Sequence, residues 1–173
     1  LDLRGYNRSD KPAGVEPYRI RALLTDVDAV LDHFGVEQAV VVGHDWGGVI
    51  GWNYAMYRPD RVAKLIVCSL PHPRGLMREL RENPAQQSSS QYARELQGEG
   101  AHDHLSAEKL AAMVAGPADR SRYVAAFERS EVRAMLAYYR ANFPAAGPSL
   151  ESDAAPASVS YTHLRAHETN VDL

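Results

Sequence analysis

The sequence has one cysteine, no long apolar run and no excess of basic residues, and each shortage argues against a class of protein. Cys68 has no partner for an intrachain disulfide, which disfavours a disulfide-stapled secreted domain and leads us to expect a reducing compartment, the cytoplasm. We also expect Cys68 to be a small, buried strand residue. Without 18 consecutive apolar residues the sequence predicts no membrane partner. The 19 Lys and Arg residues are interspersed with 22 Asp and Glu residues, giving a net charge of −3 and predicting no nucleic-acid partner.

The composition is that of a globular chain. Of its 173 residues, 45% are hydrophobic and 24% are charged, enough for one domain with a buried core. Residues 2–10 form a polar, turn-rich loop of the kind that follows a strand, yet no strand precedes them. We therefore expect that an N-terminal portion is missing.

The most informative stretch is Val40 to Gly51, which reads Val-Val-Val-Gly-His-Asp-Trp-Gly-Gly-Val-Ile-Gly. A β-branched run stops at a cluster of small residues around Asp45, and a helical pattern follows at once. This pattern predicts a strand, tight turn and helix that present one side chain at the tip of the turn. Neighbours without Cβ bulk relieve the crowding there, and Gly43, Gly47 and Gly48 are expected to do so. The nucleophile would then be a carboxylate oxygen of Asp45.

The surrounding pattern alternates between helices and strands. Apolar residues at helical spacing predict a helix over 20–34, with Gly35 at its C-terminal cap. Apolar runs predict strands over 38–43 and 62–70, and a second helix is predicted over 47–58, ended by Pro59. This order predicts an α/β fold with a parallel sheet that has helices on both faces. Asp45 then falls at the carboxyl end of a strand, where such sheets place their chemistry.

After residue 72 the alternation stops. Residues 1–72 are interpreted as a partial α/β core, and 73–148 as a helical cap that includes a helix N-capped by Ser106 and one or two helices within 120–139. Residues 149–173 are interpreted as a linker and a non-native or disordered tail. Within it, 159–169 resembles a peptide read from sequencing-adapter DNA.

Three segments together resemble one family. Asp2-Leu-Arg-Gly-Tyr, Val42-Gly-His-Asp-Trp-Gly-Gly48 and Leu70-Pro-His-Pro73 resemble the α/β-hydrolase fold, and within it the epoxide hydrolase and haloalkane dehalogenase branch, over roughly residues 1–148. Asn7 departs from the glycine usual in the family's Arg-Gly-Tyr-Gly-Arg-Ser loop, which puts the local turn in doubt. The resemblance implies a small-molecule epoxide or halogenated substrate and no cofactor.

The resemblance also implies roles for four residues. Asp45 would attack a carbon of the epoxide, and the backbone N–H of Trp46 would donate to the ester oxyanion. Tyr139, in Met135-Leu-Ala-Tyr-Tyr-Arg-Ala-Asn142, matches one of the two proton-donating tyrosines of the family cap, and Tyr92 stands where the other is expected. Tyr123 and Tyr138 are competing candidates for these donors.

Several alternatives remain open. The Trp46 indole could face a halide, so dehalogenation of a haloalkane or haloacid by the same Asp45 is the first alternative. His44 is expected to be structural and Trp52 to lie in the core. His102-Asp-His104 has no third ligand at suitable spacing, so no metal is assigned.

The family resemblance places the remaining catalytic parts outside the printed sequence. The oxyanion-hole loop would precede Leu1, and the catalytic base and acid would follow later strands. Neither His163 nor His167 has the sequence context of the base. A third possibility is therefore a non-catalytic fragment with an unpaired sheet edge, an exposed apolar face under the cap and low solubility.

Overall fold

The computed structural model describes residues 1–144, and the predicted elements are present in it. The first part contains η1 (Glu16–Tyr18), α1 (Ile20–His33), β1 (Ala39–His44), α2 (Trp46–Tyr57), η2 (Pro59–Arg61) and β2 (Val62–Cys68). Gly35 follows α1 with a φ of +63°, the conformation expected beyond a helix C-terminus. The predicted tail, with His163 and His167, lies outside the described residues.

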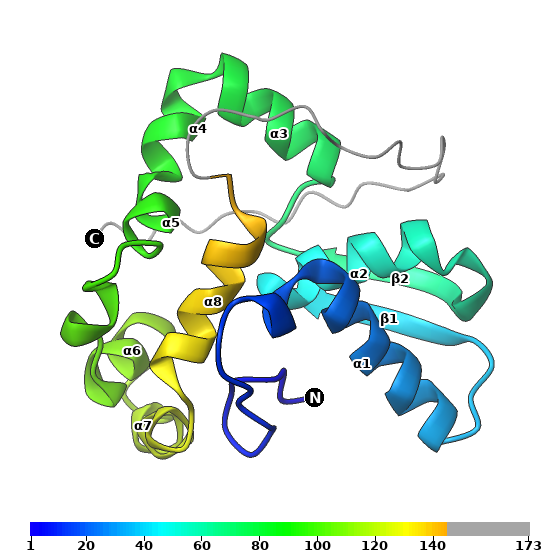
Figure 1. Cartoon of the computed structure of the whole chain (residues 1–173), viewed down its shortest axis with the longest axis horizontal. Helices are drawn as coiled ribbons and strands as arrows, with labels where there is room; N and C mark the ends of the chain where they lie inside the picture. Colours follow the sequence, from blue (N-terminus) through cyan, green and yellow to red (C-terminus); the bar gives the residue numbers. More distant parts are fainter. Residues whose placement is uncertain (145–173) are drawn as a thin grey trace.

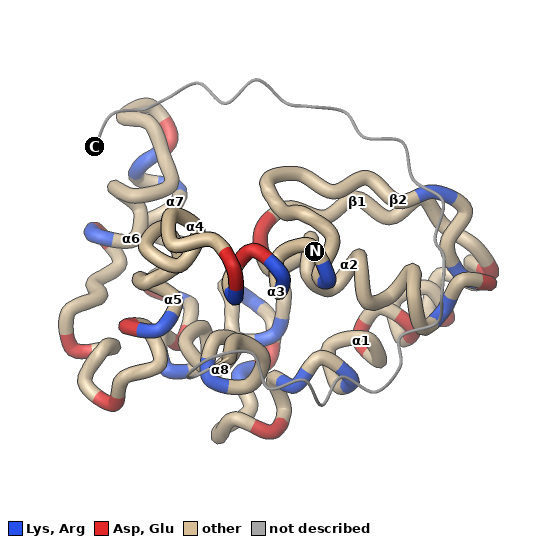
Figure 2. Tube along the Cα trace, turned by 90° about the horizontal axis from the view of Figure 1, so that it is seen from above, with Lys and Arg blue, Asp and Glu red and all other residues tan. Residues whose placement is uncertain are grey.

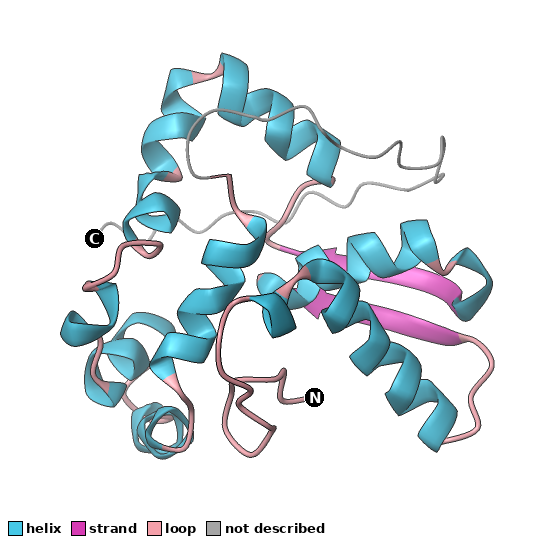
Figure 3. Ribbon diagram, viewed as in Figure 1, coloured by secondary structure: helices cyan, strands magenta, loops and turns pink. Residues whose placement is uncertain are grey.

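The two strands form the sheet of the described region. β1 and β2 pair in parallel, with Val42 opposite Ile66 and His44 opposite Cys68 (Figure 3). α2 connects them and packs against both. The α/β class with a parallel sheet is therefore confirmed, and both strands end on the side of the molecule where α8 lies (Figure 3).

The face of the sheet away from α2 carries exposed apolar side chains. Val40, Val42 and Ile66 are 54%, 66% and 49% exposed, and side chains alternate between faces along each strand. Cys68 shares this face and is exposed, so the prediction of a buried cysteine was wrong. The apolar run around Cys68 correctly indicates a strand, but within residues 1–144 nothing buries this face.

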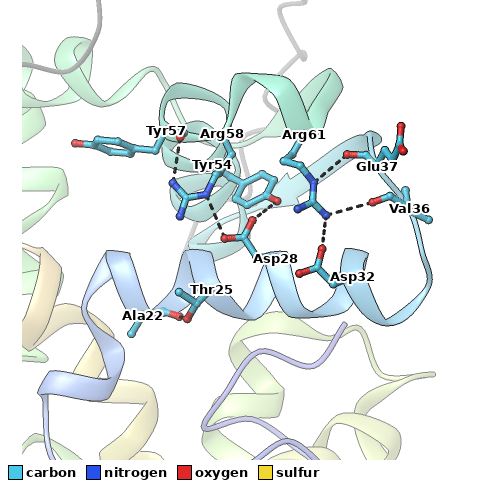
Figure 4. A network of polar contacts seen from close by, with 10 residues as sticks. All are labelled: Ala22, Thr25, Asp28, Asp32, Val36, Glu37, Tyr54, Tyr57, Arg58 and Arg61. Carbon is cyan, nitrogen blue, oxygen red and sulfur yellow. Dashed lines mark hydrogen bonds and ion pairs between the residues drawn. The ribbon is translucent and has the colours of Figure 1, made fainter.

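A polar network attaches α1 to the segment that carries α2 (Figure 4). Asp28 of α1 accepts hydrogen bonds from the Tyr54 hydroxyl, at 2.7 Å, and from Nε of Arg58, at 3.2 Å. Arg61 bonds to Asp32 at 2.8 Å and to the carbonyl of Glu37 at 2.9 Å. These contacts fix α2, and with it the turn that precedes α2.

The rest of the described chain is helical, as predicted. It comprises α3 (Pro73–Glu82), α4 (Pro84–Ser89), α5 (Gln91–Glu95), η3 (Ala101–His104), α6 (Ala107–Val114), α7 (Arg120–Glu128) and α8 (Val132–Asn142). Ser106 caps α6 by accepting a hydrogen bond from the backbone N–H of Lys109, which confirms that prediction. None of the helices within residues 1–144 is long and apolar enough to cross a membrane.

α8 lies between the sheet region and helices α5, α6 and α7 (Figure 1). Ala134, Ala137 and Tyr138 of α8 pack in one hydrophobic cluster with Trp46 and Ile50 of α2. Thus α8 shares the core of the α/β part. Along the described trace, Lys and Arg are mixed with Asp and Glu, with no extended segment of basic residues alone (Figure 2).

Candidate functional site

The turn between β1 and α2 is closed by a backbone contact that only glycine permits. A Cβ on Gly43 would lie 2.2 Å from the carbonyl oxygen of Gly47. At Gly48 a Cβ would meet Val67 Cγ1 at 3.0 Å. At Gly47 it would meet nothing within 4 Å apart from its chain neighbours and the backbone of its own helix, so the expectation that Gly47 relieves crowding with its missing side chain was wrong. Gly47 contributes its backbone, which Gly43 approaches.

Asp45 sits at the tip of this turn in a strained conformation. Its φ is +52° and its ψ −124°, a region that non-glycine residues rarely occupy and that collects at functional sites. Its backbone carbonyl accepts hydrogen bonds from the N–H groups of Gly48 and Val49, at 2.8 and 3.1 Å. Hydrogen bonds from the first turn of α2 therefore stabilise the strained conformation.

The carboxylate of Asp45 is not used to hold the fold. An aspartate at a helix N-cap commonly accepts a hydrogen bond from the first turn, but the Asp45 side chain makes no such bond. It is exposed and has no hydrogen bond or ion pair with the described residues. The N–H groups of Trp46 and Gly47 begin the helix, where backbone donors lack intrahelical acceptors. Asp45 is thus a free carboxylate beside free N–H donors.

A row of aromatic rings leads from the N-terminal loop, past Trp46, to α5. Ring centroids are 5.7 Å apart for Tyr6 and Tyr138, 5.4 Å for Tyr138 and Trp46, and 5.0 Å for Trp46 and Tyr139. Tyr92 of α5 follows, 6.4 Å from Tyr139. Tyr92 and Tyr139 come from separate helices and lie at one end of the row.

The charge of Asp45 contributes to the pKa of both phenols. Burial raises the pKa of Tyr139 to about 12, and the negative charge of Asp45 adds to this rise. Burial likewise raises the pKa of Tyr92, again with a contribution from Asp45, although Tyr92 is 58% exposed. The ring contacts bring Trp46, Tyr139 and Tyr92 together, and Asp45 adjoins Trp46 in the chain. Near neutral pH both phenols keep their protons.

The indole N–H of Trp46 is buried without a hydrogen-bond partner among the described residues. The Trp46 side chain is only 9% exposed, and its ring stands edge to face with Tyr139. This contact opposes the rise in the pKa of Tyr139, but it does not reach normal hydrogen-bond geometry. A buried donor without an acceptor is costly, so this N–H is a candidate ligand contact.

The two competing tyrosines are placed differently. Tyr138 is fully buried, and its hydroxyl donates to the carbonyl of Arg4 at 2.8 Å, so it serves the packing of α8. Tyr123 of α7 is 43% exposed and packs on Phe127, where it lines a shallow hollow with Asn7. Tyr6, by contrast, packs on Tyr138; it belongs to the Asp2-Leu-Arg-Gly-Tyr segment that carries the family resemblance, but nothing in the sequence alone predicts this contact.

The histidines of the described region are candidates for a base or a metal ligand. His44 is exposed at the end of β1. His72 accepts a hydrogen bond from the backbone N–H of Arg74 and packs against Trp52, which is buried as expected. Burial, with a smaller contribution from Arg74, lowers the pKa of His72. His102 contacts Asp103 at 3.1 Å, and residues 1–144 contain no group of three side chains placed to hold a metal.

The sequence pattern of the α/β hydrolase fold family matches residues 1–153. The AB hydrolase superfamily protein YfhM of Bacillus subtilis is 36% identical over 153 residues, which cover 81% of this chain and 54% of that protein. Epoxide hydrolase 4 of Homo sapiens is 42% identical over 92 residues, covering 53% of this chain and 25% of that protein.

Solved structures agree with these relatives. The crystal structure of a Bacillus megaterium epoxide hydrolase in complex with an inhibitor superposes with a TM-score of 0.77 and 38% sequence identity. The match covers 82% of this chain and 54% of that one. The match thus spans about half the length of YfhM and of the Bacillus megaterium enzyme.

Proposed function

We propose that this chain, which belongs to the α/β-hydrolase fold family, carries the nucleophile and the proton donors of an epoxide hydrolase. The observation that carries the proposal is an uncommitted carboxylate, Asp45, held at the turn between β1 and α2 beside two protonated phenols. Relatives named epoxide hydrolases support the same chemistry.

The first step forms an ester on Asp45. A carboxylate oxygen attacks one carbon of the epoxide, and the bond from that carbon to the epoxide oxygen breaks. The released oxygen takes a proton from Tyr139 or Tyr92, since an unprotonated alkoxide is a poor leaving group. The product is a hydroxyalkyl ester whose mass exceeds that of the protein by the whole epoxide.

The start of α2 prepares the site for the second step. Water attacks the ester carbonyl, and the backbone N–H of Trp46 would donate to the oxyanion that forms there. This step also needs a base that removes a proton from water. Within residues 1–144, Nδ1 of His72 already accepts from the backbone N–H of Arg74, and His44, which adjoins Asp45 in the chain, has no hydrogen-bond partner to orient it as that base. We therefore infer that this chain accumulates the ester and does not turn over.

We also propose the division into an α/β part over 1–72 and a helical cap over 73–148. The helices from α3 to α7 fit a lid that brings Tyr92 to Asp45, and α8 joins that lid to the core through Tyr138. Since α8 packs on α2, we expect this last helix to stay with the α/β part when the lid moves.

Dehalogenation is the second candidate, and one observation favours it. The buried Trp46 N–H has no acceptor among residues 1–144, and a halide leaving from a carbon attacked by Asp45 would supply one. The two reactions leave different masses on Asp45. An epoxide adds entirely, whereas a haloalkane adds its alkyl group and loses the halide.

The test uses the Cys68→Ser form of the 173-residue chain, because the exposed thiol of Cys68 would itself react with epoxides. Styrene oxide and 1-chlorobutane are supplied separately, and the intact protein mass is followed with time. We expect one addition of the full epoxide mass and none from the haloalkane. Asp45→Ala should abolish the addition, and His44→Gln, its exposed neighbour, should retain it. Labelling that persists in Asp45→Ala, or steady diol formation, would contradict the respective parts of the proposal.

A further inference from the structure

The helix that carries Tyr92 is too short to fix its own position. α5 has five residues, Gln91–Glu95, and a helix of that length is marginal in water without partners. Tyr92 is 58% exposed, and its ring meets Tyr139 of α8 edge to face, with 6.4 Å between the ring centroids. Tyr139, by contrast, belongs to a helix whose Ala137 and Tyr138 lie in the core. The separation of the two phenols therefore depends on how α5 is attached to α8.

Two side chains attach the end of α5 to α8, one from each side (Figure 1). Arg140 of α8 donates from Nη2 to the carbonyl of Gly98 at 2.8 Å and from Nε to the carbonyl of Gln97 at 3.2 Å. In the opposite direction, Nε2 of Gln97 donates to the carbonyl of Phe143, the C-cap of α8, at 3.3 Å. The same Nε2 donates to the carbonyl of Ala93 in α5 at 3.4 Å. Arg140 and Gln97 thus form a reciprocal clamp between the two helices.

The guanidinium of Arg140 suits this clamp because its donors form a rigid, planar fork. Two of its N–H groups reach two consecutive carbonyls, so they fix the orientation of the turn after α5 as well as its distance from α8. The backbone N–H groups of Gln97 and Gly98 bond back to the last residues of α5, at 3.1 and 3.0 Å. A shift of this turn therefore moves α5 and, with it, Tyr92.

Arg140 follows Tyr139 directly in the chain, so one stretch of α8 carries one proposed proton donor and the anchor of the other. We propose that Arg140 is a positioning residue, which holds Tyr92 at a fixed separation from Tyr139 so that both phenols donate hydrogen bonds to one epoxide oxygen. That oxygen has two lone pairs and accepts from both. Without the clamp, α5 turns away from α8 and the contribution of Tyr92 is lost. This assignment rests on the proposed function.

The test compares two epoxides of similar size that differ in their need for a proton. Propylene oxide releases a basic alkoxide, whereas the trifluoromethyl group of 1,1,1-trifluoro-2,3-epoxypropane withdraws electrons and makes the alkoxide a better leaving group. The rate of labelling at Asp45 is measured for both in the Cys68→Ser chain. Adding Arg140→Ala should lower the rate ratio of propylene oxide to its trifluoro analogue by about three- to tenfold, because propylene oxide loses more from a misplaced donor.

A second variant, Tyr92→Phe, decides whether Arg140 acts through Tyr92. Tyr92→Phe removes the phenol and should lower the same rate ratio. Adding Arg140→Ala to Tyr92→Phe should then change the ratio by less than about twofold, since no phenol is left for Arg140 to position. Two losses that multiply in the double variant would overturn the assignment. An unchanged ratio in Tyr92→Phe itself would overturn the donor role of Tyr92, and the assignment with it.

Arg133→Ala is the matched control, because Arg133 is an exposed arginine on the same helix. It should leave the ratio unchanged. Because both substrates are measured on the same sample, any loss of folded protein cancels in the ratio. An unchanged ratio in Arg140→Ala overturns the role of Arg140 while the proposed function stands. No labelling of Asp45 by either epoxide in the Cys68→Ser chain overturns both.

Discussion

Gly43 is the residue on which the geometry of Asp45 depends. A methyl group there would lie 2.2 Å from the Gly47 carbonyl oxygen, which forces the strand and the helix apart. Gly43→Ala should therefore lower the free energy of unfolding by about 3 kcal/mol or more and abolish labelling of Asp45.

Gly47→Ala is the matched control four residues away. The added methyl group meets nothing within 4 Å outside its own helix backbone and chain neighbours, and alanine favours the helix, so stability should be unchanged or higher by up to about 1 kcal/mol. Urea unfolding followed by circular dichroism measures both variants. Equal losses in the two would mean that the turn does not depend on the contact at Gly43.

Tyr139 sets the pH range over which the proposed proton donation operates. Its pKa is raised to about 12, so the donating form persists well above pH 10, where an exposed tyrosine is half ionised. The rate of labelling in brief pH-jump experiments should stay level from pH 7 to about 10.5 and fall towards pH 12. A decline centred near pH 10, and unchanged in Tyr139→Phe, would exclude Tyr139 as the donor.

At the residue scale, the sequence identifies what is local and misses what depends on distant segments. Asp45 is recognisable because strand, small residues and helix are adjacent in the chain. The packing of Tyr6 on Tyr138 is not recognisable, because the bonds that hold its loop join it to residues 130 and 131, far along the chain. The burial of Cys68 was mispredicted because burial depends on which segments cover a strand. The strand's own sequence does not specify those segments.

At the scale of elements, α8 is attached to the α/β part by one side chain in particular. Oδ1 of Asn142 accepts from the backbone N–H of Ile20 at 2.9 Å, and its Nδ2 donates to the carbonyl of Tyr18 at 2.8 Å. The same Nδ2 also donates to the carbonyl of Tyr138 at 3.0 Å. Asn142 thereby caps the start of α1 with the end of α8.

Asn142→Ala should consequently lower the free energy of unfolding by about 1–3 kcal/mol, since it leaves partly buried backbone groups without partners. Asn53→Ala is the control, because the Asn53 side chain of α2 bonds, within residues 1–144, only to the carbonyl of Val49, one turn earlier. That variant should change stability by less than about 0.5 kcal/mol. Similar losses in both variants would contradict the role given to Asn142.

Helix and strand positions were largely predictable at this scale, because their apolar spacing is a property of consecutive residues. The partnership of α8 was not predictable in the same way. The spacing of apolar residues in α8 predicts an amphipathic helix but does not indicate which element packs against its apolar face. Only the placement of Tyr138 against Trp46 and Tyr6 shows that the helix belongs to the core.

At the scale of the whole molecule, the open face of the sheet dominates the behaviour expected in solution. Val40, Val42 and Ile66 lie on adjacent parallel strands and together form an exposed apolar surface. Such surfaces favour association, so the 173-residue chain should self-associate at micromolar concentration.

Val42→Lys should reduce this association, because it places a charge at the centre of the surface without touching α2. Met113→Lys adds the same charge on α6, at a residue that is 76% exposed, and should have no effect. Light scattering against protein concentration compares the two. Equal improvement by both would indicate that net charge, not the sheet face, controls association.

The central claim is that Asp45 is a nucleophile that forms an ester with an epoxide, and the most direct test is to locate the modified atom. The Cys68→Ser chain is labelled with styrene oxide, digested and sequenced by tandem mass spectrometry, with and without hydroxylamine, which cleaves esters. We predict that the full epoxide mass lies on Asp45 and is released by hydroxylamine. A label on any other residue, or one on Asp45 that hydroxylamine does not remove, would contradict the claim.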